Sequence, residues 1–151
     1  MSVIEIDRGW KRIKQELKRI DNSAVNVGVL QSAGSYEGGQ SIATIAVANE
    51  LGVPSKRIPP RPFMHIAFDD NKSQLETKTS SLKDDIYSGR ATTRKALGIL
   101  GEMHTGHIKM VIGSDKLEPN APSTIRRKKT TKPLIEKGRL LGSITYEVDL
   151  K

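Results

Sequence analysis

Residues 120–148 read NAPSTIRRKKTTKPLIEKGRLLGSITYEV, and this stretch combines three kinds of sequence. A loop marked by proline comes first, a dense basic run follows, and a short apolar segment leads into an alternating strand pattern. Between residues 126 and 139, seven cations and one anion give a net charge of +6, so the rest of the chain keeps only +2 of the total +8. Any partner bound through charge should therefore meet this segment.

The basic run predicts contacts with an anionic partner. Four consecutive cations at 126–129 stand beside serine and threonine, and all these groups bind phosphate oxygens. The run has no interleaved aromatic residue for base stacking, and no DNA-reading module is apparent, so nucleic acid would be bound through its backbone. A solubilising loop and an arm that orders on an acidic partner protein are the alternatives. The candidate contact residues are Arg126, Arg127, Lys128, Lys129, Lys132 and Lys137.

Length and composition fit one domain over residues 1–151. With 36% hydrophobic and 4% aromatic residues, the core must consist mostly of Ile, Leu, Val and Ala, and partners are one way to complete its burial. The absence of cysteine excludes disulfides and thiolate metal sites. No signal peptide is apparent and no apolar run approaches the ~18 residues of a membrane span, so we expect a soluble, intracellular protein without membrane contact.

The hydrophobic pattern predicts an α+β fold, with a small antiparallel sheet packed against an N-terminal helix and two long helices, plus a long basic loop. An apolar stripe at helical spacing from Ile6 to Ile20 predicts a first helix with Asp7 as N-cap, packed on its own domain or on another subunit. Alternation predicts strands at 24–30 and 144–150. Further helices are predicted at 42–51, 63–87 and from about 92 to 111, with a short turn or helix at 139–143 and flexible loops at about 31–40 and 115–133.

Glycine and proline leave two local alternatives open. Gly98, Gly101 and Gly106 lie inside the second long helix, where each costs up to ~1 kcal/mol relative to alanine. They either permit close helix crossing or break the helix near Gly106. Residues 55–64 contain three prolines, which hold the backbone extended. We favour a rigid connector that delivers Phe63 to the core over a polyproline segment read by a partner.

Catalysis and cofactors are not expected. His104 and His107, three positions apart on one predicted helix, present two metal ligands, to which His65 or Glu102 would add a third. The glutamate of an HExxH motif is missing, and a core or surface role explains each histidine better. No serine lies in a nucleophile motif, and the glycines at 34–39 lack the lysine of a phosphate-binding loop. A metal-dependent enzyme is the most distant alternative.

Three pieces of the sequence carry a family resemblance. KPLIEKGRLLGSITYEV (132–148) matches a pattern of Pro-Leu-Ile/Leu, an acidic residue, Ser/Thr and Gly-Arg-Leu before a strand, although Lys137 stands at the Ser/Thr position. IAVANELGVPSKRIPPRPFM (45–64) matches a helix followed by Gly and Ile-Pro-x-Arg-Pro-Phe, with Leu51 where an aromatic is common, and NAPSTIRRK (120–128) matches the loop between them. Together they resemble the virion morphogenesis proteins of tailed phages, which complete the tail or join it to the head. The motif positions are Gly52, Pro59, Arg61, Pro62, Phe63, Pro133, Leu134, Gly138, Arg139, Leu140, Ser143 and Ile144.

The resemblance implies a non-catalytic structural protein of the virion neck or tail end, present in the host cytoplasm during assembly. It implies a ring of identical subunits that contacts head–tail connector or adaptor proteins, tail terminator or tail tube proteins, and DNA in the lumen. Ring interfaces are heterologous, so a loop such as 118–132 would reach the next subunit or the channel. Residues 138–140 should anchor the final strand, and 58–63 should form a fixed turn. The alternative is a sequence-nonspecific DNA-binding protein acting through 126–139.

Overall fold

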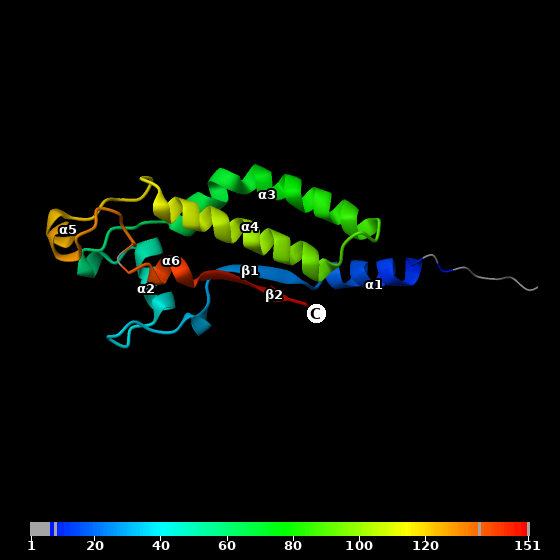
Figure 1. Cartoon of the computed structure of the whole chain (residues 1–151), viewed down its shortest axis with the longest axis horizontal. Coiled ribbons are helices and arrows are strands. Elements are labelled where there is room, and N and C mark those ends of the chain that lie inside the picture. The colour runs from blue at the N-terminus through cyan, green and yellow to red at the C-terminus, as the bar shows by residue number, and fades with distance from the viewer. Residues whose placement is uncertain (1–6, 8, 136, 151) are drawn as a thin grey trace, which may run out of the picture.

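The computed structural model describes residues 7, 9–135 and 137–150, and these form the α+β fold that the hydrophobic pattern predicts. Figure 1 shows α3 and α4 as two long helices lying over a small sheet, with α1 at one end of the molecule and α2, α5 and α6 at the other. No helix in the described ranges is both long enough and apolar enough to cross a membrane. The elements are α1 (Trp10–Ile20), β1 (Ala24–Val29), η1 (Gln31–Ala33), α2 (Ile42–Leu51), η2 (Pro54–Lys56), α3 (Phe63–Tyr87), α4 (Thr93–Gly113), α5 (Pro122–Lys128), α6 (Arg139–Ser143) and β2 (Ile144–Asp149), where η denotes a 3₁₀ helix.

The sheet joins two strands that are far apart in the chain. β1 and β2 pair antiparallel, in a register that runs from Ala24 opposite Asp149 to Val29 opposite Ile144. Directly opposite residues of an antiparallel pair point to the same face. The predicted alternation therefore gives one apolar face, which packs against α4, and one polar face. The apolar face carries Val25, Val27, Val29, Ile144, Tyr146 and Val148.

The core is built around α4. Ile108 and Ile112 of α4 are fully buried, together with Phe63 of α3 and Ile144 of β2. Halfway along the helix, a Cβ atom on Gly101 would lie 2.5 Å from both Cγ and Cδ2 of Tyr146. Gly101 therefore allows the strand, and not another helix, to approach α4 closely. The helix continues through Gly106 to Gly113 without a break, so the predicted break is wrong, and the close approach at Gly101 is made by a strand instead of the predicted crossing helix.

A buried glutamate of α1 caps the start of α4. Glu16 is only 5% exposed, and its Oε2 accepts a hydrogen bond from the Thr93 backbone N–H at 2.7 Å. Thr93 begins α4, where the first N–H groups have no acceptor within the helix. Arg19 Nη1 donates to the other carboxylate oxygen at 2.8 Å. The Thr93 backbone hydrogen bond lowers the pKa of Glu16, against the opposing effect of burial.

Replacing Glu16 by glutamine should lower the free energy of unfolding by about 1 kcal/mol at neutral pH, as expected for a weakened helix cap. The Glu16 pKa is lower in the folded chain than its usual 4.5. The stabilisation is therefore present above about pH 4.5 and is lost as the pH falls through the folded pKa. Urea unfolding between about pH 7 and pH 3 should show the difference from wild type shrinking in acid. A difference that stays constant across this range would contradict the assignment; Glu102→Gln, on an exposed part of α4, is the control.

The first helix begins later than the pattern predicts. Gly9, at φ 94°, occupies the N-cap position, so α1 starts at Trp10 and the assignment of Asp7 as N-cap is wrong. Asp7 Oδ1 instead accepts hydrogen bonds from the backbone N–H groups of Gly9 (3.0 Å) and Lys11 (3.3 Å). Ile6, the first residue of the predicted apolar stripe, lies outside the described residues.

Both segments predicted as flexible loops contain regular structure. Residues 31–40 hold η1 and a turn in which the Tyr36 N–H donates to the Gln40 carbonyl at 2.9 Å. Within 115–133 the chain forms α5, because Pro122 presets the backbone for the first helical turn. Lys129, at φ 54°, ends the helix. Residues 126–128 of the basic run form the last turn of α5, where the helix dipole favours cations.

Candidate functional site: a basic groove

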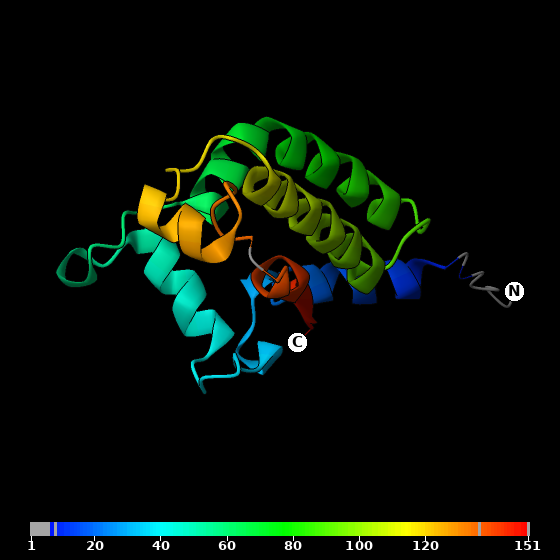
Figure 2. The ribbon, with the colours of Figure 1, turned by 60° about the vertical axis from the view of Figure 1, so that its left-hand side comes forward.

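A groove of about 1330 Å³ lies at the end of the molecule that carries α2, α5 and α6. Figure 2 brings this end forward and shows the segment around η2 and the helix α5 on either side of α2. The groove is lined by residues from five parts of the chain: 36–40, 45–49, 54–61, 118–128 and 134–140.

Arg61 joins three of these parts. It is 8% exposed, and its backbone N–H donates to the Asn49 carbonyl at 2.6 Å. Its guanidinium donates to the carbonyls of Glu118 (2.7 Å) and Pro119 (3.2 Å). Longer contacts reach the side-chain oxygens of Asn120 (3.4 Å) and Asn49 (3.5 Å). Burial lowers the pKa of Arg61 and the charge of Glu118 raises it. The buried Arg61 therefore connects α2 to the segment that leads into α5 through hydrogen bonds.

Glu50 joins α2 to α3. Its carboxylate accepts hydrogen bonds from the backbone N–H groups of Met64 and His65, each at 3.0 Å. Both groups lie in the first turn of α3, where the helix supplies no acceptor and its dipole favours a negative charge. Pro62 occupies the N-cap position and makes no side-chain cap, so the carboxylate from α2 takes that place.

Between Glu50 and Arg61 the chain turns sharply at Gly52. Its φ of 74° and ψ of 164° lie in a region that is essentially open only to glycine. Val53 and Ile58 then pair in an isolated bridge, with N–H to carbonyl distances of 2.9 and 3.1 Å. Residues 53–61 therefore form a closed turn that stands as one wall of the groove and leads into the fully buried Phe63.

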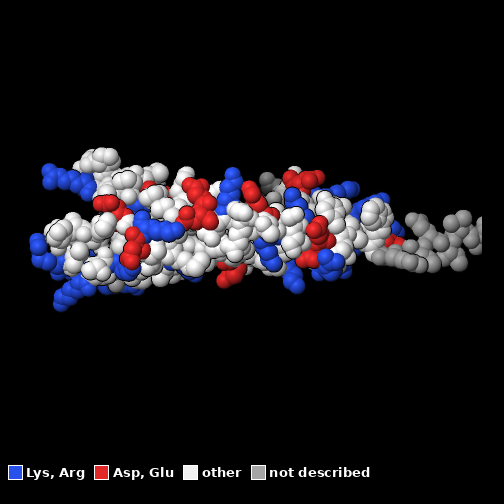
Figure 3. Space-filling model, turned by 90° about the horizontal axis from the view of Figure 1, so that it is seen from above, with Lys and Arg blue, Asp and Glu red and all other residues white. Residues whose placement is uncertain are grey.

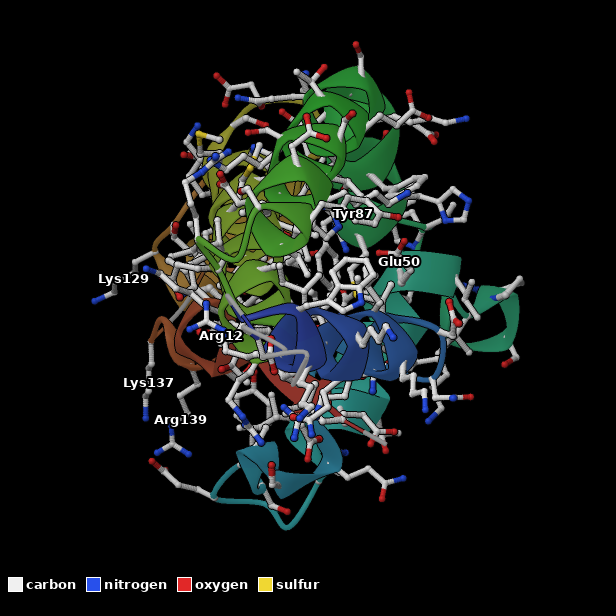
Figure 4. All side chains as sticks on the ribbon, turned by 90° about the vertical axis from the view of Figure 1, so that its right-hand side faces the viewer. Arg12, Glu50, Tyr87, Lys129, Lys137 and Arg139 are labelled. Carbon is white, nitrogen blue, oxygen red and sulfur yellow. The ribbon has the colours of Figure 1, made fainter. Side chains whose placement is uncertain are left out.

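Some of the predicted basic contact residues line the groove, and others lie outside it. Arg127 and Lys128 belong to the described lining of the groove, whereas Arg126 and Lys129 do not. Figure 4 shows Lys129 pointing outward, away from the rest of the molecule. Lys132 forms an ion pair with Asp115 at 2.5 Å, outside the groove.

Lys137 and Arg139 share one carboxylate at the groove. Glu37 Oε1 lies 3.4 Å from Lys137 Nζ and 2.8 Å from Arg139 Nη2. Figure 4 shows the two cationic side chains pointing the same way. The Arg139 guanidinium also lies 5.9 Å from the ring centroid of Tyr36. Two cations against one anion leave a surplus of positive charge here.

Some motif residues of the piece 132–148 line the groove, and others are buried in the core. Of the residues expected to anchor β2, Leu140 is buried, Gly138 is the N-cap of α6 at φ 70°, and Arg139 faces the groove. The Ser143 hydroxyl donates to the Leu140 carbonyl at 2.7 Å, within α6. Pro133 and Ile144 are buried, and Leu134, half-buried at φ 63°, lines the groove.

The two histidines of α4 lie away from the groove. Their ring centroids are 5.9 Å apart, and both Nδ1 atoms are buried without a hydrogen-bond partner among the described residues. Burial lowers both pKa values, and the charge of His107 lowers that of His104 further. No group of three His, Cys, Asp or Glu residues in the described ranges is placed to hold a metal ion. The third ligand considered from the sequence, His65 or Glu102, is not brought to this pair.

Sequence reasoning missed Arg57, which stands on the wall opposite α5. The only signal was the pair of arginines in the proline-rich segment 55–64, and nothing in the sequence placed that segment beside the basic run. Comparison with known proteins found no matching family model, and neither a curated protein nor a solved structure with significant similarity.

Proposed function

We propose that this protein is a structural component of a tailed phage or prophage virion that completes the tail and joins it to the head at the neck. One observation carries the proposal. The three pieces that resemble this family, 45–64, 120–128 and 132–148, all contribute to one groove. Arg61 of the first piece contacts Asn120, the first residue of the second, at 3.4 Å, and the third supplies Leu134, Arg139 and Leu140 to the lining.

We further propose that the protein acts as a ring of identical subunits formed on assembly. Several large apolar side chains stay in solvent on the single chain: Trp10, Leu51 and Tyr87 are 57%, 72% and 58% exposed. Exposed apolar groups of this size favour further burial against other protein surfaces. In a ring the groove end would meet a different surface of the next subunit, or the adjoining connector or tail ring.

Loss of the gene from its phage or prophage should leave DNA-filled heads and finished tails that are not attached to one another. Electron microscopy of the lysate measures this directly. Purified wild-type protein added to the extract should restore joined, infectious particles. Normally joined virions from the deletion strain would overturn the proposal.

The second candidate is a sequence-nonspecific DNA-binding protein. Exposed Arg126 and Lys129 at the end of α5, which lie outside the groove lining, are the observation that favours it. Such a protein loses affinity for duplex DNA steeply as salt rises, because each phosphate contact releases counterions. Tight, salt-sensitive DNA binding together with intact virions from the deletion strain would select this function.

A further inference from the structure

We infer that the groove is a docking site for an acidic polypeptide segment of a partner protein, in which carboxylates alternate with apolar side chains. This inference rests on the proposed function only in placing the partner among virion proteins. The docking itself is a property of the groove and can be measured on the purified chain.

The inner surface of the groove is apolar. Ile45 and Ala48 of α2, Ile58 of the turn and Leu134 all line it, and all four are partly buried rather than fully exposed. Burial of such surface contributes about 25 cal/mol for each Å² removed from water. An occupant with apolar side chains would gain this contribution, and a purely ionic one would not.

The rims of the groove are cationic on opposite sides. Among the described residues of its lining, six are cations and two are anions. Arg57 on the turn and Arg127 on α5 are exposed and form no ion pair among the described residues. Figure 3 shows this end of the molecule notched between two lobes, with Lys and Arg side chains on both. The charge of the groove is therefore complementary to an acidic segment that lies between the lobes.

The size of the groove favours a polypeptide over a small molecule. Its volume of about 1330 Å³ exceeds the ~300–1,000 Å³ that is usual for small-molecule pockets. A chain segment several residues long fills such a space, with backbone and side chains together covering the apolar lining.

The lining disfavours a nucleic acid backbone. Duplex DNA carries one charge per ~1.7 Å of its axis, so it cannot avoid the carboxylates of Glu37 and Glu118 that interrupt the cations. Tyr36 is the one aromatic residue in the described part of the lining, and the Arg139 guanidinium lies 5.9 Å from its ring centroid, so the groove has no series of aromatic rings on which successive bases could stack. A polypeptide places its carboxylates at intervals and fits between these anions.

Fluorescence anisotropy with the purified full chain tests the inference. The probe is a fluorescein-labelled peptide of alternating Asp and Leu residues, and the comparison probes are the Asn-Leu and Asp-Ser peptides of equal length and a labelled DNA duplex. We expect the Asp-Leu peptide to bind at least about tenfold more tightly than either comparison peptide. Equal binding of the Asp-Ser peptide, absence of Asp-Leu binding, or tighter and strongly salt-dependent duplex binding would each overturn the docking site.

The matched variants locate the binding. Arg57→Glu combined with Arg127→Glu should weaken Asp-Leu binding about tenfold or more, because both rims change sign. Lys72→Glu combined with Lys109→Glu makes the same change of charge on exposed parts of α3 and α4, outside the groove, and should leave binding within about twofold. Circular dichroism and urea unfolding establish that all variants fold. Equal losses in the two proteins would show that net charge, and not the groove, attracts the peptide.

Head–tail joining in extract separates the two proposals. If wild-type protein restores joining and the Arg57→Glu, Arg127→Glu protein does not, both stand. If both proteins restore joining, the placement of the docked partner among the virion proteins fails while the proposed function holds. If wild-type protein does not restore joining, the proposed function fails whatever the peptide measurement shows.

Discussion

Replacing Gly52 by alanine should lower the free energy of unfolding by about 3 kcal/mol. Two effects add at this position. A side chain at φ 74° and ψ 164° is strained, at about 1–3 kcal/mol. The new Cβ would also lie 2.8 Å from the backbone nitrogen of Pro60 and 3.1 Å from the carbonyl oxygen of Ile58. These are backbone atoms of a closed turn, so they cannot move aside as the end of a side chain would.

Gly39→Ala is the matched control for this variant. Gly39 has a nearly identical φ of 76°, but a Cβ built there meets nothing within 4 Å. Gly39→Ala should therefore lower the free energy of unfolding only through backbone strain, by about 1 kcal/mol. Urea unfolding of both variants measures the difference. Equal losses would show that the turn against Pro60 relaxes freely, and the wall of the groove would then not be rigid.

Gly101→Ala should lower the free energy of unfolding by about 2 kcal/mol, although alanine is a better helix former by ~1 kcal/mol. The reason is the contact with β2. The new Cβ would lie 2.5 Å from Cγ and 2.9 Å from Cβ of Tyr146, which are atoms close to the strand backbone. The new Cβ and Tyr146 can separate only if the strand moves away from α4, and this movement disturbs the apolar face of the sheet.

Gly106→Ala, in the same helix, should have the opposite sign. A Cβ at Gly106 meets nothing within 4 Å, so only the helix propensity remains and stability should rise by up to ~1 kcal/mol. Thermal or urea unfolding of the two variants measures this contrast. In a Tyr146→Ala background the harm from Gly101→Ala should decrease. Two variants with the same sign would contradict the packing of Tyr146 on Gly101.

Patterns in the sequence predicted most of the regular elements. The helix over 42–51, the long helix from Phe63 and the two alternating strands follow from hydrophobic spacing and from breakers such as Gly52. The helix α5 was missed because a seven-residue helix shows too little apolar periodicity, and Ile125 is its only large apolar residue. Its start at Pro122 was the available signal.

The long-range contacts of the fold and of the site could not be predicted from the sequence. Glu16 and Glu50 cap helices other than their own, whereas the sequence rules for caps concern residues within a few positions of the helix start. The hydrogen bonds of Arg61 to residues 118–120 and the opposition of Arg57 to α5 depend on tertiary packing. The resemblance singled out Arg61 and Gly52, and the structure supplies a physical reason for each.

The pairing of β1 with β2 also determines the order in which the molecule can form during synthesis. Val25 pairs with Val148, so the first strand has no partner until the ribosome has translated all of α3, α4 and the segments that follow them. The α3–α4 pair is joined by a short turn and has no such delay, because contacts close in sequence need little loop closure. Until β2 emerges, the nascent chain exposes an unpaired strand with three valines, a segment at risk of aggregation or of chaperone capture. A ribosome that stops before Ile144 would release a chain in which that strand is never covered.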